Sequence, residues 1–343
     1  MKKILFVEYD YQKGHVNFNR IHIDALKTNG YDVKLIVFDK TADVLPYPKE
    51  DYRLILPAWM RKREHHPIFN RLLFLIALSY IKIRIGMKQY DATIISSLDE
   101  ISLSILPLTK GMFIICHRNA ADFENKIKKY AMKRLAKYNS FIVFNEYMAA
   151  PFLKEGIKNI FIVSHGCVQP FTQNKEENIP SYIYDYKKII FHPSPKPDIQ
   201  FVKALLEDKD INKYLQDQHI LILLREKPNC IQATNNIRFI DRYLSIQQYQ
   251  TLFMIADIIL LAYPPSFKYQ VSGVSYECVS NQKLMLCLKQ PSLLYTKDFY
   301  NYNPIFDNIE DFHNKLKSIL SHPEIQCTTS ISSLTPNYSQ IIQ

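Results

Sequence analysis

Short apolar runs that do not alternate with polar residues recur along this chain, and they constrain its fold more than any other feature. The first half contains KILFVEY, VKLIVF, ATIISS, MFIICH, SFIVFN and IFIVSHG, and the second contains KKIIFHP, HILILL, NIRFID, DIILLAY and KLMLCL. Continuous apolar strands are typical of parallel sheets, which helices cover on both faces. Amphipathic segments separate most of the runs, such as NFNRIHIDALKTNG, where Phe18, Ile21 and Ala25 share a face. The pattern predicts an α/β fold of doubly wound, Rossmann-like parallel sheets.

A polar stretch with two prolines, QPFTQNKEENIPSYIYDY, interrupts this rhythm near the middle of the chain. At 343 residues the chain also suits two domains of ordinary size better than one. We therefore predict an N-terminal domain over residues 1–175 and a C-terminal domain over residues 176–325, facing each other across a cleft. Residues 326–343 show little patterning, and we expect a poorly ordered tail there.

Charge and composition narrow the class of partner. The formal net charge is +10 and the pI is near 9.1, which favours an anionic partner: nucleic acid, an acidic membrane surface or a phosphorylated substrate. No aromatic-interleaved basic strand is visible, which argues against nucleic acid. Six cysteines without a CxxC pair indicate reduced thiols in a cytosolic protein, and the histidines lack metal-ligand spacing, so we expect no metal. Neither a GxGxxG motif nor a Walker A loop occurs, which argues against a dinucleotide enzyme or a P-loop NTPase, and we expect no cofactor.

The N-terminus, MKKILFVEYD, is predicted to form a first strand because it lacks the long apolar region of a signal peptide. The longest apolar stretch, LLFLIALSYI, has ten residues, about half of the roughly 20 that span a bilayer. We therefore expect a soluble or peripheral protein.

Ligands of doubly wound sheets bind at the carboxyl ends of the strands, so the loops there are the candidate sites. In the first half, these loops hold Gly14, His15, His117, His165 and Gly166. His117 can bond a substrate hydroxyl or can be a packed histidine that the backbone satisfies. The glycines and the other histidines are equally compatible with ordinary turns. Asn119 and Asp122, which follow His117, can simply cap the next helix.

Three cations follow the first two strands of the second half: Lys196, Arg225 and Lys227. Arginine offers a planar fork and lysine a mobile point charge, and both suit a diphosphate. Solvated loop charges are the alternative.

The segment QVSGVSYECV places Gly273 at the start of a predicted helix. Ser272 can cap this helix, while the free N–H groups around Gly273 and Val274 can bind an anion that the helix dipole favours. Glu277 lies one turn further on the same face, where it can accept hydrogen bonds from a ribose diol. A simple cap with an exposed glutamate is the alternative.

The chain resembles the GT-B glycosyltransferases, especially the large retaining family 4, the glycogen-synthase-like group. The resemblance covers most of the chain to about residue 320 and is best over IRFIDRYLSIQQYQTLFMIADIILLAYPPSFKYQVSGVSYECVSNQKLMLC. It implies that Gly273 and the neighbouring amides of Ser272 and Val274 bind the phosphates of a donor, and that Glu277 binds the ribose of a UDP- or GDP-linked sugar. It further implies that Lys196 binds the diphosphate, that His117 lies near the donor sugar, and that Gly14 is the first-loop glycine.

The sequence departs from the family pattern at two positions. Tyr269 stands where the family carries a second glutamate that touches the donor sugar, eight residues before the ribose-binding one. The arginine that precedes the diphosphate-binding lysine is absent, His192 stands near its place, and Arg225 is a candidate substitute. The first departure puts retention of the anomeric configuration in question.

Two basic segments favour a membrane surface. Seven Lys or Arg and one acid lie between Arg61 and Lys88, and six Lys or Arg without an acid lie between Lys126 and Lys137. Basic helices with an apolar stripe suit an anionic membrane, although the stripe can equally be core and the charges a solvated face. For acceptor or membrane contact we select Arg61, Lys62, Arg63, Lys129 and Lys133.

The features together predict a metal-independent, retaining hexosyltransferase, cytoplasmic and peripheral at the inner face of the membrane. It would move a sugar from a nucleotide-diphosphate sugar to a lipid-linked or cell-surface glycan in polysaccharide, lipopolysaccharide or capsule synthesis. One alternative is a nucleotide-sugar epimerase of the same fold, for which Asp99, Glu100 and Asp122 are the candidate acids. The other is an inactive GT-B protein that scaffolds a membrane complex.

Overall fold

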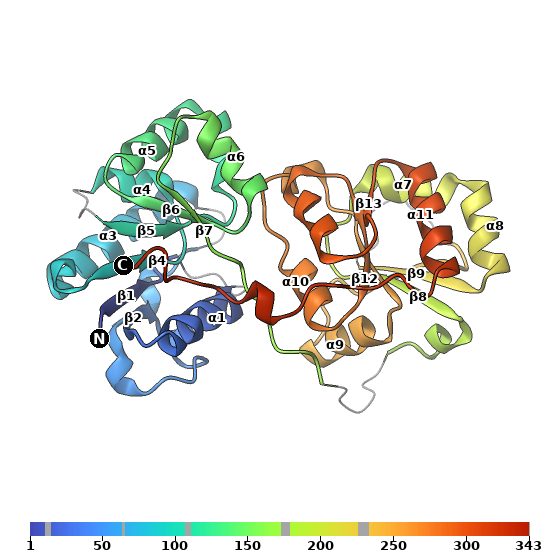
Figure 1. The fold of residues 1–343 in the computed structure, drawn as a ribbon, viewed down its shortest axis with the longest axis horizontal. Helices are drawn as coiled ribbons and strands as arrows, with labels where there is room; N and C mark the ends of the chain where they lie inside the picture. Colours follow the sequence, from blue (N-terminus) through green and yellow to red (C-terminus); the bar gives the residue numbers. More distant parts are fainter. Residues whose placement is uncertain (11–14, 64–65, 107–110, 173–178, 226–232, 343) are drawn as a thin grey trace. The chain divides into compact units, whose positions relative to one another are not determined.

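The structure, a computed structural model, describes residues 1–10, 15–63, 66–106, 111–172, 179–225 and 233–342. The chain forms two compact units. Unit 1 comprises Met1–Gly166 and Leu334–Gln343, and unit 2 comprises Cys167–Ser333. Figure 1 shows the course of the chain through both.

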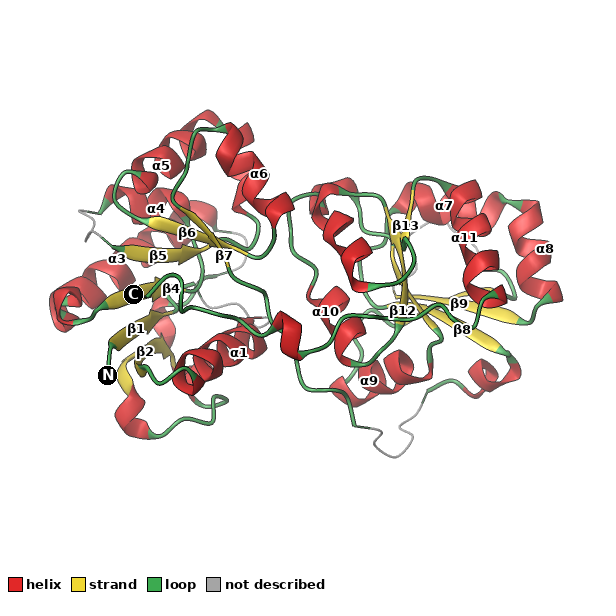
Figure 2. Ribbon diagram, in the orientation of Figure 1, coloured by secondary structure: helices red, strands yellow, loops and turns green. Residues whose placement is uncertain are grey.

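Unit 1 is a seven-stranded parallel sheet of order β3-β2-β1-β4-β5-β6-β7. Its strands are β1 (Lys3–Val7), β2 (Asp32–Phe38), β3 (Tyr52–Leu56), β4 (Ala92–Ile95), β5 (Met112–Ile115), β6 (Ser140–Val143) and β7 (Ile160–Ile162). Its helices are α1 (His15–Thr28), α2 (Asp39–Ala42), α3 (Pro67–Ile85), α4 (Glu100–Ile105), α5 (Lys126–Ala136) and α6 (Glu146–Lys154). In Figure 2, α1 lies on one side of this sheet and α4 and α5 lie on the other.

Unit 2 repeats the plan with six parallel strands in the order β10-β9-β8-β11-β12-β13. The strands are β8 (Lys188–His192), β9 (Ile220–Arg225), β10 (Ile237–Ile240), β11 (Ile258–Leu261), β12 (Leu284–Leu288) and β13 (Ile305–Phe306). The helices are α7 (Ile199–Glu207), α8 (Lys209–Asp217), α9 (Ile246–Ile255), α10 (Gly273–Ser280) and α11 (Ile309–Ser321). Side chains of α7, α8 and α11 pack with the strands in one core cluster.

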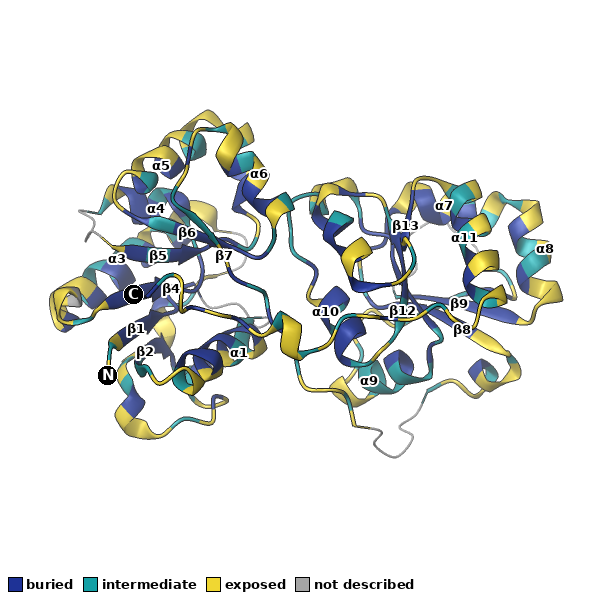
Figure 3. Cartoon of the chain, in the orientation of Figure 1, coloured by how far each residue is buried: buried dark blue, intermediate teal, exposed yellow. Residues whose placement is uncertain are grey.

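The predicted fold class is confirmed: both units are doubly wound parallel sheets, and every apolar run quoted above contributes a strand. The reason is visible in Figure 3, where the strands of each sheet are buried beneath helices with exposed outer faces. Strand residues such as Leu5, Ile114, Leu223 and Leu260 are completely buried. Among the described residues, no helix combines the length and apolar character that a bilayer crossing needs.

The C-terminal segment differs from the prediction of a poorly ordered tail over 326–343. Its last ten residues return to unit 1, where Tyr338 is completely buried and donates a hydrogen bond of 2.6 Å from its hydroxyl to Nδ1 of His22. Ile342 is also buried. The division between the units falls after Gly166, nine residues before the predicted boundary at 175. Local patterning missed the segment because its partners lie in α1, more than 300 residues earlier in the chain.

Candidate functional site

The strand order of unit 2 identifies where a ligand is expected to bind. The order reverses between β8 and β11, and the loops that follow these two strands leave the sheet at the same edge. Such a switch point forms a crevice at the carboxyl ends of the strands. The loop after β11 leads to Ser272 and α10, so the predicted anion-binding helix starts near this edge.

The start of α10 corrects one prediction about its cap. Ser272 occupies the N-cap position, but its side chain makes no capping hydrogen bond. Its hydroxyl instead lies 2.9 Å from the hydroxyl of Tyr263, and its backbone carbonyl accepts a bond from the Ser275 hydroxyl at 2.6 Å. The first N–H groups of the helix therefore lack the side-chain partner that the sequence predicted, and they are available to an anion.

Gly273 has no local structural role that demands glycine. Its φ lies outside the left-handed region, and a Cβ at this position would meet nothing within 4 Å. The residue is exposed at the first position of α10, with Val274 beside it. Open space at an uncapped helix start lets a phosphate approach the backbone closely.

Glu277 lies one turn along α10 from Gly273 and is only partly exposed. The Tyr249 hydroxyl, from α9, donates a hydrogen bond of 2.5 Å to its Oε2. Burial raises the pKa of the Glu277 carboxyl to about 7, although the bond from Tyr249 opposes the shift. The side chain is therefore held in place, and the charge on its carboxyl changes near neutral pH.

The cations predicted for the diphosphate have different environments. Lys196 is exposed in the loop after β8, where its backbone N–H bonds Oγ of Ser194 at 3.2 Å. Arg225, at the end of β9, donates from Nη1 to the Pro193 carbonyl at 2.7 Å and from Nη2 to the Arg242 carbonyl. Two of its N–H groups thus hold loops together, which leaves Lys196 as the more accessible cation. Lys227 lies outside the described residues.

His192 does not replace the family's arginine as a cation. Its ring is completely buried between the carbonyls of Ser194 and Ala262, at 3.0 and 3.2 Å from Nδ1 and Nε2. Burial lowers the pKa of His192 to about 4, so the ring is neutral at physiological pH.

In unit 1, His117 belongs to a packed aromatic cluster at the carboxyl ends of the strands. Its ring stacks on His15 with 4.2 Å between centroids and meets the edge of Phe18 at 4.4 Å. Its Nε2 lies 3.0 Å from the Ser96 carbonyl, to which it donates. Burial holds the pKa of His117 well below its usual range. These contacts favour the packed interpretation, while the ring stays partly exposed at its strand end.

His165 and Gly166 have structural explanations. His165 lies against Phe18 and Phe144, and Nδ1 of its ring donates to the Gly166 carbonyl at 3.1 Å. Gly166 has a φ of +80°, and a Cβ there would collide with Ile21, so the turn needs glycine. Gly14, the predicted first-loop glycine, lies outside the described residues.

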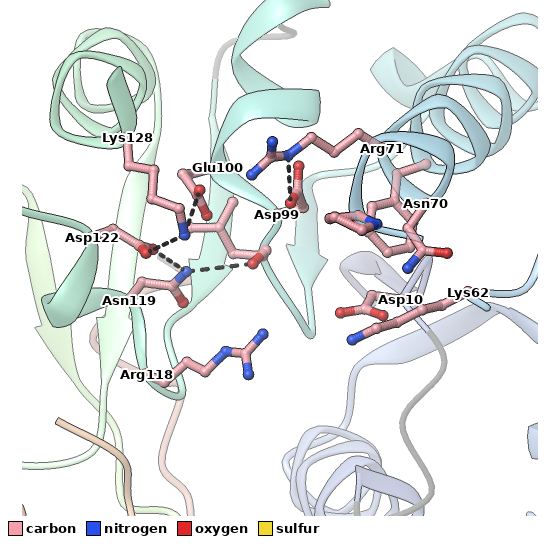
Figure 4. Close-up of a pocket in the computed structure, with 13 residues that line it drawn as sticks. Asp10, Lys62, Asn70, Arg71, Asp99, Glu100, Arg118, Asn119, Asp122 and Lys128 are labelled. Carbon is pink, nitrogen blue, oxygen red and sulfur yellow. Dashed lines mark hydrogen bonds and ion pairs between the residues drawn. The ribbon is translucent and has the colours of Figure 1, made fainter. Parts of the chain in front are cut away.

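At the switch point of unit 1, charged side chains surround a cavity of about 180 Å³. It opens beyond the ends of β1, β4 and β5, and Figure 4 shows its charged side chains. The lining residues that matter below are Asp10, Lys62, Arg71, Asp99, Glu100, Arg118, Asp122 and Lys128. The three acids considered from the sequence, Asp99, Glu100 and Asp122, thus lie around one cavity.

Ion pairs divide these acids into two groups. The Lys128 ammonium lies 2.8 Å from Oδ1 of Asp122 and 3.1 Å from Oε1 of Glu100, and the Asn119 amide donates to Asp122 at 2.8 Å. Asp99 caps α4 by accepting from the Ser102 N–H, and Arg71 lies 3.8 Å from its other oxygen. Burial raises the pKa of Glu100, and the nearby charge of Asp122 acts in the same direction. Glu100 is therefore a carboxyl with a raised proton affinity at the wall of the cavity, which suits a general acid.

Several of these residues were missed from the sequence. Tyr249 and Tyr263 gave no signal because they act through contacts with Glu277 and Ser272 that only the fold creates. Arg118 had a usable signal, since it follows His117 directly after β5. Arg71 reaches the cavity from a helix, and its position could not be inferred from strand ends.

The residues selected for acceptor or membrane contact lie in three environments. Lys129 and Lys133, on α5, pair with Glu155 at 2.6 and 3.1 Å. Arg61 lies 3.5 Å from Asp39, and the Arg63 guanidinium lies over the ring of Phe69. Lys62 lines the cavity.

The apolar stripe of α3 is mainly core, as the alternative interpretation held. Its buried face carries Leu73, Phe74, Ala77, Leu78 and Ile81. An exposed apolar group remains around the start of the helix, which we call the α3 patch: Trp59, Ile68, Phe69 and Leu72, at 55%, 81%, 41% and 52% exposure.

No protein-family model and no curated protein matches this chain. Solved structures do match. Sucrose-phosphate synthase from Thermosynechococcus elongatus has a TM-score of 0.64 at 11% identity, over 100% of this chain and 96% of the other. A UDP-N-acetylglucosamine 2-epimerase from Listeria monocytogenes has a TM-score of 0.60 at 8% identity, over 94% and 89%. HepE from Anabaena, in complex with UDP and glucose, has a TM-score of 0.58 at 12% identity, over 98% and 94%.

These similarities extend over nearly the whole of each chain, so they concern the complete two-domain fold. At such low identity they show the fold alone. The fold is that of the GT-B neighbours, while the predicted membership of family 4 stays a prediction.

Proposed function

We propose that the chain is a glycosyltransferase that uses a nucleotide-diphosphate sugar as its donor. The observation that carries the proposal is the uncapped, open start of α10 at the switch point of unit 2, with Glu277 one turn further on. Neighbours of the same fold include glycosyltransferases and epimerases, one of them with UDP and glucose bound, which supports a nucleotide-sugar ligand.

In the proposed complex, the diphosphate lies against the N–H groups at Gly273 and Val274. Lys196 adds a mobile positive charge, and the helix dipole adds a fixed one. Glu277 accepts hydrogen bonds from the ribose hydroxyls, held in position by Tyr249. These groups stabilise the charge that develops on the departing diphosphate, so the reaction proceeds without a metal ion.

The finer features of the reaction are also proposals. Retention follows from the family resemblance, although Tyr269 stands where the family has its second glutamate. The phenol of Tyr269 cannot supply that carboxylate. The anomeric configuration of the product therefore has to be measured, because it shows directly whether the reaction retains or inverts. We propose a lipid-linked or cell-surface glycan as acceptor, as in polysaccharide, lipopolysaccharide or capsule synthesis.

Calorimetric titration with UDP, GDP, CMP and their sugar conjugates tests the donor site. We expect saturable binding of one diphosphate nucleotide, because helix-bound phosphate and a ribose carboxylate recognise a nucleoside diphosphate irrespective of the sugar. Lys196→Met should lower the affinity for the nucleotide about tenfold. Lys213→Met, which removes an exposed lysine elsewhere in unit 2, is the control and should leave the affinity unchanged. Silence across the whole panel would contradict the proposal and favour an inactive scaffold.

A second candidate, a nucleotide-sugar epimerase, is favoured by one observation. Asp99, Glu100 and Asp122 surround one cavity, and burial raises the pKa of Glu100. Moving a proton at a sugar carbon needs such acids and bases. Incubation with the bound nucleotide sugar separates the two: an epimerase converts it to an isomer without an acceptor, whereas a transferase leaves the configuration at the ring carbons unchanged.

We propose further that the protein acts at the inner surface of a membrane. The α3 patch supplies exposed apolar side chains, and Arg61, Lys62 and Arg63 are close to it in sequence. Apolar side chains inserted among anionic headgroups, with cations around them, give salt-sensitive binding.

Sedimentation with vesicles that contain phosphatidylglycerol tests the membrane proposal. The double substitution Ile68→Ser and Leu72→Ser should weaken binding about tenfold or more, because burying one such side chain contributes roughly 1.5–3 kcal/mol. Ile246→Ser, which removes an apolar side chain that is 74% exposed in unit 2, is the matched control. An equal loss of vesicle affinity in both variants, or no vesicle binding by the unmodified protein, would contradict the membrane proposal.

A further inference from the structure

The cavity of unit 1 contains two cations that are not committed to its acids. Lys128 pairs with Glu100 and Asp122, and Arg71 lies beside Asp99. Among the residues that the structure describes, Arg118 and Lys62 form no ion pair with a carboxylate. The lining holds four acids, the fourth being Asp10, and four cations, so its formal charges balance. The positive charge is unevenly placed, because Arg118 and Lys62 have only Asp10 left to face.

These two cations converge on one part of the cavity. In Figure 4, the Arg118 side chain extends from the end of β5 and the Lys62 side chain approaches it from the opposite side. Both also act on His15: burial is the main reason that the pKa of His15 falls to about 4, and the charges of His165, Arg118 and Lys62 add to the shift. Arg118 and Lys62 are both positively charged, and an anion bound between them would relieve their mutual repulsion.

The size and walls of the cavity limit what can accompany that anion. A volume of about 180 Å³ is close to the roughly 150 Å³ that encloses a benzene ring, so one six-membered ring fits. Phe74, Leu98 and Pro67 provide apolar wall, and Asp10 and Asp99 provide carboxylate oxygens. An apolar ring face together with hydroxyl acceptors is the environment that a pyranose needs.

We propose that this cavity binds a single sugar ring that carries an anionic group, either a carboxylate or a phosphate. The Arg118 guanidinium and the Lys62 ammonium bind the anion, while Asp10 and Asp99 accept hydrogen bonds from ring hydroxyls. The inference rests on the proposed function in one respect, that this sugar is the acceptor end of the glycan. A cationic sugar is disfavoured because Asp99, Glu100 and Asp122 already have cationic partners. A neutral sugar would bring no counter-charge to Arg118 and Lys62.

Direct titration of the full chain with glucuronate, glucose 6-phosphate, glucose and inorganic phosphate tests the proposal. We expect one or both anionic sugars to bind at least about tenfold more tightly than glucose or inorganic phosphate, because a charge-assisted hydrogen bond contributes that much. Glucuronate alone would identify a carboxylate, and glucose 6-phosphate alone a phosphate. Arg118→Met and Lys62→Met should each remove about tenfold of the affinity.

The control is Lys154→Met, which removes one exposed positive charge from α6 of the same unit. It should leave binding unchanged, and thermal unfolding of each variant reports whether the fold is retained. Binding of glucose as tight as that of the anionic sugars, no binding of either anionic sugar, or full affinity in Arg118→Met would each overturn the inference. Nucleotide titration is read separately: absence of nucleotide binding by the unmodified protein rejects the donor site, whereas the sugar titrations alone decide the cavity.

Discussion

Acidification from pH 6.5 to about 4 is expected to destabilise unit 1 more than unit 2. Burial lowers the pKa of His15 and His165 to about 4 and that of His22 to about 3, and it holds the pKa of His117 well below its usual range. In the unfolded chain a histidine takes up its proton near pH 6.5. Stability is therefore present above that pH and is lost as the pH falls towards the folded values.

His22 shows why the loss is large. Its ring is completely buried, with Nδ1 accepting from Tyr338 and Nε2 donating to the His165 carbonyl at 3.1 Å. That pattern requires the neutral ring, because protonation removes the acceptor that Tyr338 uses. One pKa unit corresponds to about 1.4 kcal/mol, so His22 alone can withdraw several kcal/mol and release the C-terminal segment.

Buried carboxyls act in the opposite direction and must be counted. Burial raises the pKa of Glu8 to about 7 and raises that of Glu100, so the folded unit 1 keeps protons that the unfolded chain loses above pH 4.5. Those two offset part of the effect of four histidines. In unit 2, Glu277 offsets His192, and His313 adds a smaller contribution from a more exposed position.

Hydrogen exchange followed by mass spectrometry along a pH series measures this order of unfolding. Peptides of α1 and of residues 334–342 should lose protection first, and those of β8, β9 and β11 later. His22→Gln removes a ring whose protonation costs stability, so the loss of protection in unit 1 between pH 6.5 and 4 should be smaller in this variant than in the unmodified protein. Substitution of the exposed His322 by glutamine should leave that loss unchanged. Simultaneous loss of protection in both units would contradict the prediction.

The sheets could be predicted because each strand carries its own signal. Runs such as those of β1 and β9 are apolar on both faces, and that property depends on no distant residue. The helical segments between these runs then indicate that consecutive strands are joined by helical crossovers and are parallel. Local information was enough for the fold class and for two domains.

The candidate site was only partly predictable, because its contacts join distant segments. Ser272 has the ideal residue type for a cap, but the Tyr263 hydroxyl binds its side chain instead. Tyr338 is buried against α1 by a contact across 316 positions. In contrast, Asp99 and Glu100 could be located at the edge of the sheet, because they lie in the sequence only four and five residues after the end of β4.

Replacement of Glu277 by glutamine is expected to weaken nucleotide binding about tenfold to a hundredfold at pH 8. A hydrogen bond to a charged group contributes roughly 1.5–3 kcal/mol, and the variant keeps the shape of the side chain without its charge. Because the pKa of Glu277 is about 7, the unmodified protein should bind more tightly as the pH rises through that value. The variant should show no such dependence, and the two affinities should approach each other below pH 6.

The Glu277→Gln variant also shows whether weaker binding comes from a lost contact or from a lost fold, because the substitution should affect affinity and stability in opposite directions. Its pKa in the folded protein is raised from 4.5 to about 7 by burial, so its contribution to stability is present below pH 4.5 and is lost as the pH rises to 7. Glu277→Gln should therefore be as stable as the unmodified protein or more stable at pH 8, while it binds nucleotide less tightly. Glu310→Gln, an exposed glutamate in the first turn of α11, is the control and should alter neither property. Unchanged affinity in a folded Glu277→Gln variant would remove Glu277 from the donor site.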